Sequence, residues 1–76
     1  MEYKIKTAWI LTINAFEGGQ EIYGVYANED LANDAINDEL FMYYLNGRTA
    51  TDELVESFYA DINPDIQEHQ IIIKLK

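Results

Sequence analysis

The stretch YKIKTAWILTI, residues 3–13, alternates two kinds of side chain. Its odd positions carry bulky apolar or β-branched residues such as Trp9 and Leu11, whereas its even positions include Lys4 and Lys6. A period of two is typical of a strand that buries one face. We therefore predict that this stretch is the first strand of a sheet, with one of its two faces buried.

Two further strands are expected on either side of a helical segment. EGGQ, residues 17–20, supplies glycines that tolerate the positive φ of a hairpin loop. The next stretch, EIYGVYA at residues 21–27, is rich in β-branched and aromatic residues and is predicted as the second strand. HQIIIKLK, residues 69–76, is predicted to close the chain as the third strand.

The lysines of the first and third strands bear on how these strands pair. In a simple antiparallel register, Lys4 and Lys6 would face Lys74 and Lys76. Like charges directly opposite one another destabilise a strand pair, so charge argues against this pairing. The order of the strands in the sheet is left open.

A long helix is predicted between Asn28 and Gly47. Asn28 is a favourable N-cap, and Glu29 and Asp30 lie in the first turn, where the helix dipole favours negative charge. Gly47 is a typical residue after a helix end. The apolar residues between these ends recur at helical spacing: Leu31, Ala32, Ala35, Ile36, Leu40, Tyr43 and Tyr44.

A short second helix is predicted to begin at Thr49 or Thr51, although SFYADI, residues 57–62, also fits a strand. Its apolar residues again follow helical spacing: Leu54, Val55, Phe58, Tyr59 and Ile62. NPD, residues 63–65, ends this element because proline disfavours helical backbone in the residue before it. The order is therefore ββααβ, a single α+β domain spanning residues 1–76, in which a three-stranded, mainly antiparallel sheet has one long and one short helix on one face.

Charge is distributed very unevenly along the chain. The net charge is −9, from fourteen acids and five bases. Residues 28–68 contain eleven of the acids and a single base, Arg48, so this segment carries −10 and the remainder +1. Such acidity disfavours direct binding to nucleic acid or to an anionic membrane surface.

Composition also indicates the compartment. The chain has no cysteine, which suits a reducing environment, and we expect a cytoplasmic protein. No apolar run reaches the eighteen or so residues of a membrane span. KIKTAWILTI, residues 4–13, alternates with polar residues and lacks a cleavage site, so it is interpreted as a strand rather than a signal peptide.

No catalytic motif is found, and we expect neither enzymatic activity nor a cofactor. Ser57 and His69 are the only serine and histidine, and without cysteine there is little from which to assemble an activated nucleophile. A carboxylate acting as general acid needs a pocket that raises its pKa, which a chain of this size has little interior to form. The pair Gly18 and Gly19 fits a hairpin loop better than a phosphate cradle, since no helix follows it.

DINPD, residues 61–65, partly matches a calcium-binding loop. This fragment matches the first three acidic or amide positions of a calcium-binding helix-loop-helix loop. However, Ile66 stands where the loop needs glycine, and Ile72 where it needs a bidentate glutamate. A proline turn is the preferred interpretation, and no metal is expected.

The strongest functional signal is a column of acids in the long helix. Asp30, Asp34 and Asp38 are spaced at i, i+4, which places them about 6 Å apart along a regular helix. This spacing is close to that of successive phosphates on one nucleic-acid strand, given an axial rise of about 3.4 Å per nucleotide and the turn around the axis. A second row is expected from Asp52, Glu53 and Glu56.

Two resemblances accompany this pattern. The charge, the size and the absence of cysteine resemble the small acidic DNA-mimic proteins that bacteriophages use against restriction, CRISPR or repressor proteins. Separately, IYGVYANEDLANDAI, residues 22–36, is similar to the strand-to-helix entry of many short bacterial and phage proteins of unknown function. The first resemblance implies a partner with a basic, DNA-binding or RNA-binding surface, and neither implies catalytic residues.

A third expectation concerns the sheet face opposite the helices. If the helices cover Trp9 and Leu11, the other face carries an apolar centre with lysines at its rim, which is the composition of a protein interface. A sheet-to-sheet homodimer is therefore predicted, with Ile10, Tyr23, Val25 and Ile72 at its centre.

The sequence thus predicts a non-enzymatic acidic binding protein that inhibits a nucleic-acid-binding protein by mimicry. The alternative is an interaction or oligomerisation module whose acidic residues only keep a small protein in solution.

Overall fold

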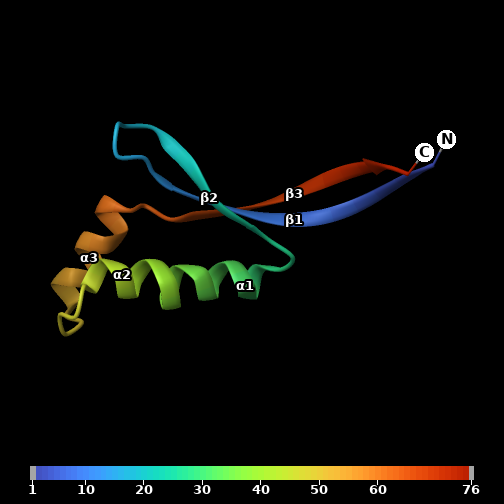
Figure 1. Ribbon diagram of the computed structural model, residues 1–76. Helices are drawn as coiled ribbons and strands as arrows, with labels where there is room; N and C mark the ends of the chain where they lie inside the picture. The colour runs from blue at the N-terminus through green and yellow to red at the C-terminus, as the bar shows by residue number, and fades with distance from the viewer. Residues whose placement is uncertain (1, 76) are drawn as a thin grey trace.

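The protein forms an open three-stranded antiparallel sheet with its helices on one side, as Figure 1 shows for the computed structural model. The structure describes residues 2–75. The strands are β1 (Tyr3–Asn14), β2 (Gln20–Tyr26) and β3 (Asp65–Lys74), in the spatial order β2-β1-β3. The predicted ββααβ order and α+β class are confirmed.

Strand β3 begins earlier than predicted. It starts at Asp65, opposite Thr12, instead of at residue 69, and Ile66 lies opposite the fully buried Leu11. Asp65 was predicted to belong to the proline turn at residues 63–65, and residues 66–68 were assigned to no element. In the structure Asp65 is half-buried, whereas Gln67 and Glu68 are exposed at the sheet edge. Lys76, which the sequence placed at the end of this strand, lies outside the described residues.

The expectation that charge opposes pairing of β1 with β3 is wrong. The two strands pair antiparallel, with Lys4 opposite Ile73 and Lys6 opposite Ile71. Lys74 lies opposite Tyr3, and residues opposite one another share a sheet face. The observed register therefore places Lys74 on the other face from Lys4 and Lys6, so the lysines do not meet.

The long helix is continuous but not uniform. It consists of α1 (Glu29–Asp34), a π-helical segment η1 (Ala35–Leu40) and α2 (Phe41–Leu45). In the π-helical segment the backbone N–H of Phe41 donates to the carbonyl of Ile36, five residues earlier. The spacing of the apolar residues does not indicate this wider turn.

Both ends of the long helix follow the predicted signals. The Asn28 side chain accepts a hydrogen bond from the Leu31 N–H at 2.8 Å. At the other end Asn46 and Gly47 adopt positive φ, which ends the helix. The Arg48 side chain then donates to the carbonyls of Leu45 and Tyr44, at 2.9 and 2.8 Å.

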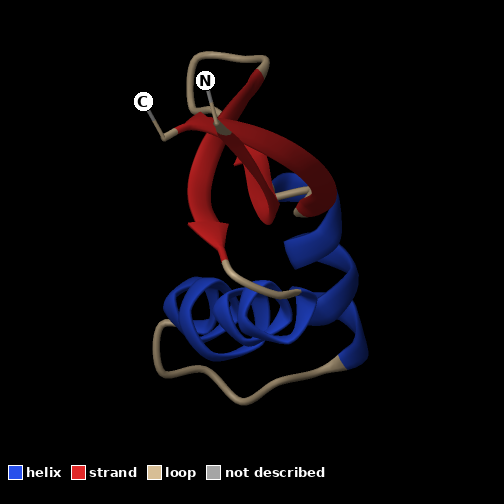
Figure 2. Cartoon of the chain, turned by 90° about the vertical axis from the view of Figure 1, so that its right-hand side faces the viewer, coloured by secondary structure: helices blue, strands red, loops and turns tan. Residues whose placement is uncertain are grey.

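The second helix, α3 (Asp52–Asp61), resolves the choice between helix and strand for this segment. Thr51 is its N-cap and accepts from the Leu54 N–H at 3.2 Å. The helix stops where Asn63 takes positive φ before Pro64. Figure 2 shows the long helix beneath the strands and α3 rising steeply beside it towards the sheet.

The core lies between β1 and the helices. Its largest fully buried side chains are Leu11 and Phe58, which are 0% and 1% exposed. The Phe58 ring makes edge contacts with three other rings, at centroid distances of 5.1 Å to Phe41, 5.5 Å to Tyr44 and 5.2 Å to Tyr59. These rings join α3 to the C-terminal half of the long helix.

Part of the sheet extends beyond the helices. β2 pairs only with residues 9–14 of β1, so residues 3–8 of β1 pair with residues 69–74 of β3 alone. We call these two segments the projecting ribbon. It carries both chain ends away from the body in Figure 1, and the molecule measures 54 × 26 × 15 Å.

Candidate binding surface

The three aspartates of the predicted column are exposed on the long helix. Asp30 and Asp34 lie in α1, and Asp38 lies in the π-helical segment. In an α-helix a step of four residues overshoots one full turn by about 40°. Residues of a π-helical turn rotate by a smaller angle, because its hydrogen bonds run from i to i+5. Asp38 is therefore rotated about the helix axis back towards the direction in which Asp30 lies.

Two of these aspartates share a shallow hollow with residues of β2 and α1. Asp34 and Asp38 line it together with Glu39, Tyr26 and Leu31, and its volume is about 240 Å³. Burial, followed by the charge of Glu39, raises the pKa of Tyr26. Asp34, Asp38 and Glu39 thus lie on the flank of the long helix beside β2.

The second acidic row lies elsewhere on the molecule. Asp52, Glu53 and Glu56 are exposed on α3, which packs against α2 at the C-terminal end of the long helix. Asp30 lies at the opposite end, about 20 Å away along the helix axis at 1.5 Å per residue. The Asp30 end of the first row therefore lies far from the second row, whereas Asn37, the neighbour of Asp38, lines a hollow together with Val55 of α3.

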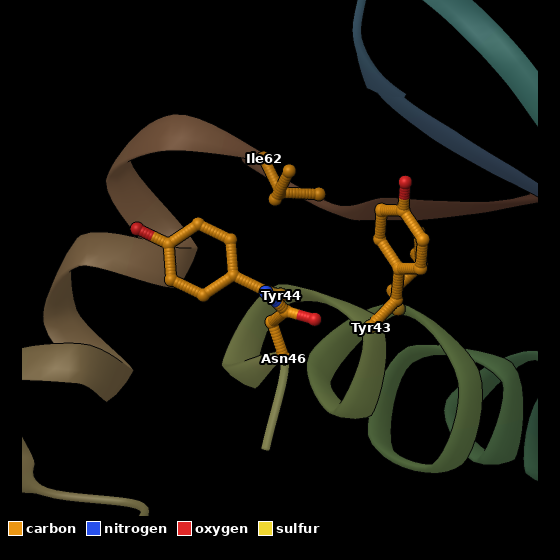
Figure 3. A pocket seen from close by; sticks show the side chains of 5 residues that line it. Tyr43, Tyr44, Asn46 and Ile62 are labelled. Carbon is orange, nitrogen blue, oxygen red and sulfur yellow. The ribbon is translucent and has the colours of Figure 1, made fainter. Parts of the chain in front are cut away.

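An aromatic hollow opens between the β1–β2 hairpin and the long helix. It has a volume of about 600 Å³ and is lined by Ile13, Tyr23, Glu39, Leu40, Tyr43 and Ile62. A neighbouring hollow of about 350 Å³ shares three of these residues and adds Tyr44 and Asn46, as Figure 3 shows. We call the two together the tyrosine hollow. Its walls come from four elements or loops, which is why sequence reasoning did not find it.

A β-bulge explains why Tyr23 points into this hollow. Gly24 lies opposite Leu11 and Ile22 lies opposite Thr12, which leaves Tyr23 as the additional residue on β2. Its hydroxyl donates to Oε2 of Glu39 on the long helix at 3.1 Å. Burial and this hydrogen bond raise the pKa of Tyr23.

A second tyrosine fixes the position of α3. The Tyr44 hydroxyl donates to Oδ2 of Asp61 at 2.8 Å, which links the long helix to the end of α3. This hydrogen bond is the main cause of the raised pKa of Tyr44. Asn14 of β1 also contacts the same place, because its side chain donates to the Asp61 carbonyl at 3.1 Å.

The predicted dimer face is divided between two sides of the sheet. Ile10 and Val25 lie opposite one another on the face away from the helices. The bulge turns Tyr23 to the helix side instead. Ile72 lies opposite Ile5, whose odd position places it on the other face from Ile10. The prediction therefore needs correction, since it assumed one uninterrupted alternation along both β2 and β3.

The structure does not bring together Ser57 and His69, the only serine and histidine of the chain. Ser57 lies on α3, whereas His69 lies on β3 with a ring nitrogen 3.3 Å from Oε1 of Gln67. Within residues 2–75 no three His, Asp or Glu side chains are grouped closely enough to hold a metal ion. In the same range, no helix has the length and apolar character needed to cross a membrane.

Comparisons with known proteins give no match from which a function could be inferred. No protein-family model matches this chain, and no curated protein or solved structure is significantly similar to it.

Proposed function

We propose that this protein is a non-enzymatic binding protein whose acidic helical layer docks onto a basic surface of a partner protein. The observation that carries the proposal is the lack of compensating charge around the exposed acids. Arg48 is the only base between residues 28 and 68, and its guanidinium is engaged by carbonyls at the end of the long helix. Carboxylates whose charge no base of the same segment neutralises are available to lysines and arginines of another molecule.

The arrangement of the aspartates favours a partner that normally binds nucleic acid. Asp30, Asp34 and Asp38 follow one another at intervals of four residues along one helix, and in its α-helical part this interval corresponds to about 6 Å, comparable to the distance between successive phosphates. The wider turn rotates Asp38 back towards the line of Asp30. A lysine- and arginine-lined groove would meet a charge pattern similar to that of one DNA strand. The protein would then inhibit its partner by occupying that groove.

The tyrosine hollow offers an anchor for one cationic side chain of such a partner. Leu40 and Ile62 provide apolar walls for the stem of an arginine, and Glu39 provides a carboxylate at the rim. The ring of Tyr43, which is 88% exposed, is available for stacking against a guanidinium. Arginine suits this site better than lysine because its planar group both stacks and pairs with a carboxylate.

Affinity capture from a lysate of the source cells tests the proposal. Wild-type protein is compared with the variant Asp30→Asn/Asp34→Asn/Asp38→Asn at low and high salt. The control is Glu2→Gln/Glu17→Gln/Glu21→Gln, because these are the three acids outside the acidic segment and their removal changes the net charge equally.

The expected result is a DNA-binding or RNA-binding protein that wild type and the control capture at low salt. Added duplex DNA should compete it away, and the aspartate variant should fail to capture it. Equal capture by all three forms would contradict the proposal.

The alternative function, a self-association module whose acidity only maintains solubility, is favoured by one separate observation. Apolar side chains of the projecting ribbon are exposed because the ribbon extends beyond the helices. If no partner depends on the aspartates but the protein self-associates through the ribbon, this alternative replaces mimicry.

A further inference from the structure

The projecting ribbon exposes apolar side chains on both of its faces. Ile5 and Ile72, on one face, are 63% and 67% exposed, and Ile71 and Ile73, on the other, are 42% and 38% exposed. A ribbon of two strands has no second layer and is marginally stable on its own. Clustered exposure of this kind is typical of a surface that contacts another protein.

The outer edge of the ribbon is also open. Since β3 is the last strand in the order β2-β1-β3, no strand of the described residues pairs with its outer side. The unpaired N–H and C=O groups of an edge strand are a template for another strand. The edge runs along all of β3, from Asp65 to Lys74.

The distribution of charge indicates which strand pairs with the open edge of β3. The ribbon carries Lys4, Lys6 and Lys74 and no acid, whereas the segment from residue 28 to residue 68 carries −10. Two copies that approach through their helical layers bring like charges together. Two copies that approach through their ribbons keep the helical layers, which carry most of the charge, at opposite ends of an elongated assembly, and only the three lysines of each ribbon repel one another.

We propose that β3 pairs antiparallel with β3 of a second copy of this chain. The product is a six-stranded sheet with a two-fold axis perpendicular to it. Such an axis preserves the faces of the sheet, so both acidic helical layers lie on the same side.

Symmetry and charge together select the register of this pairing. Opposite residues share a face and successive residues alternate between faces, so an axis that preserves the faces must pass midway between one residue and its own copy. With Ile71 at the axis, Glu68 of each copy lies opposite Lys74 of the other, which forms two pairs of opposite charge. With Gln70 or Ile72 at the axis, Lys74 instead faces the uncharged Ile66 or Gln70. The Ile71 register is therefore favoured.

The variant Ile71→Glu tests the axis. Within one chain Glu at this position lies opposite Lys6, so the fold gains a favourable cross-strand pair. Across the proposed axis the same side chain faces its own copy, and the two negative charges repel. The matched control is Ile73→Glu, which lies opposite Lys4 within the chain but faces His69 across the interface.

Sedimentation velocity over a range of concentrations, with circular dichroism to verify folding, provides the measurement. We expect wild type and Ile73→Glu at twice the 8.8 kDa mass of one chain, and Ile71→Glu folded but shifted to the monomer. A wild type that stays monomeric at millimolar concentration, or an Ile71→Glu variant that dimerises like wild type, overturns the proposal.

A charge exchange tests the register independently. Glu68→Lys and Lys74→Glu each place like charges opposite one another and should weaken the dimer, whereas the double variant should restore it. Absence of restoration contradicts the register. Val25→Lys, at a 57% exposed position on the open sheet face, should leave the dimer intact. Loss of the dimer in Val25→Lys but not in Ile71→Glu would assign the contact to that face and overturn edge pairing.

Discussion

At the scale of single residues, the helix ends were the most predictable feature of this protein. Asn28 and Gly47 act as cap and terminator within a few residues of their own backbone, so their effect depends little on the rest of the fold. The partners of Tyr44 and Tyr23 were not predictable. Asp61 and Glu39 lie 17 and 16 residues away in sequence, and both contacts depend on how separate elements pack.

The Asn28 cap should contribute measurably to stability. Asn28→Ala removes the acceptor for the Leu31 N–H, and we expect the free energy of unfolding to fall by about 1 kcal/mol. Asn33→Ala is the matched control, because Asn33 is exposed inside α1 and alanine favours helix there. Urea denaturation followed by circular dichroism measures both. Equal loss in the two variants would show that the cap does not have this role.

The hydrogen bond between Tyr44 and Asp61 should make stability dependent on alkaline pH. Folding raises the pKa of Tyr44, so the neutral phenol is favoured in the folded state. Its contribution is complete below the unfolded pKa of about 10 and is lost as pH rises through the higher folded value. We expect Tyr44→Phe to lower the urea midpoint at pH 7 and to reduce the further decrease above pH 10. Tyr43→Phe, at the exposed neighbouring residue, should match wild type at both pH values.

At the scale of elements, a helix or strand could be predicted where the apolar residues recur with a strong period, and could not be predicted where the period is weak. The alternation in β1 and the helical spacing of α3 predicted their elements, and the structure decided for helix where SFYADI also fitted a strand. The start of β3 was missed because DIQE has one apolar residue among polar ones. The π-helical segment has hydrogen bonds that are one residue wider than those of an α-helix, and the bulge at Tyr23 adds one residue to β2. The spacing of apolar residues in the sequence predicts neither feature.

Packing of α3 should depend on one side chain. Phe58 is 1% exposed and contacts three aromatic rings, so Phe58→Ala should cost about 3–5 kcal/mol of unfolding free energy. That loss is large for a small domain, and we expect a mostly unfolded variant by circular dichroism. Phe16→Ala is the control, because Phe16 is fully exposed at the hairpin. A cooperative, wild-type-like transition in Phe58→Ala would contradict the core as described.

At the scale of the whole molecule, charge asymmetry was readable from the sequence and spatial grouping was not. Most of the acidic segment forms the helical layer, and Lys4, Lys6 and Lys74 are part of the projecting ribbon. The apolar residues predicted to share one face were separated, because faces follow from the register and the bulge. The tyrosine hollow, which we propose as an anchor for a partner's arginine, likewise exists only once the hairpin lies over the long helix.

The central claim is that the acidic helical layer occupies a nucleic-acid-binding surface, and displacement of DNA tests it most directly. A fluorescently labelled duplex is bound to the captured partner, and its anisotropy is followed during titration with this protein. We predict that wild type and Glu2→Gln/Glu17→Gln/Glu21→Gln release the duplex, and that Asp30→Asn/Asp34→Asn/Asp38→Asn does not at the same concentrations. Equal release by the aspartate variant, or a stable complex that contains both the duplex and this protein, would contradict the account.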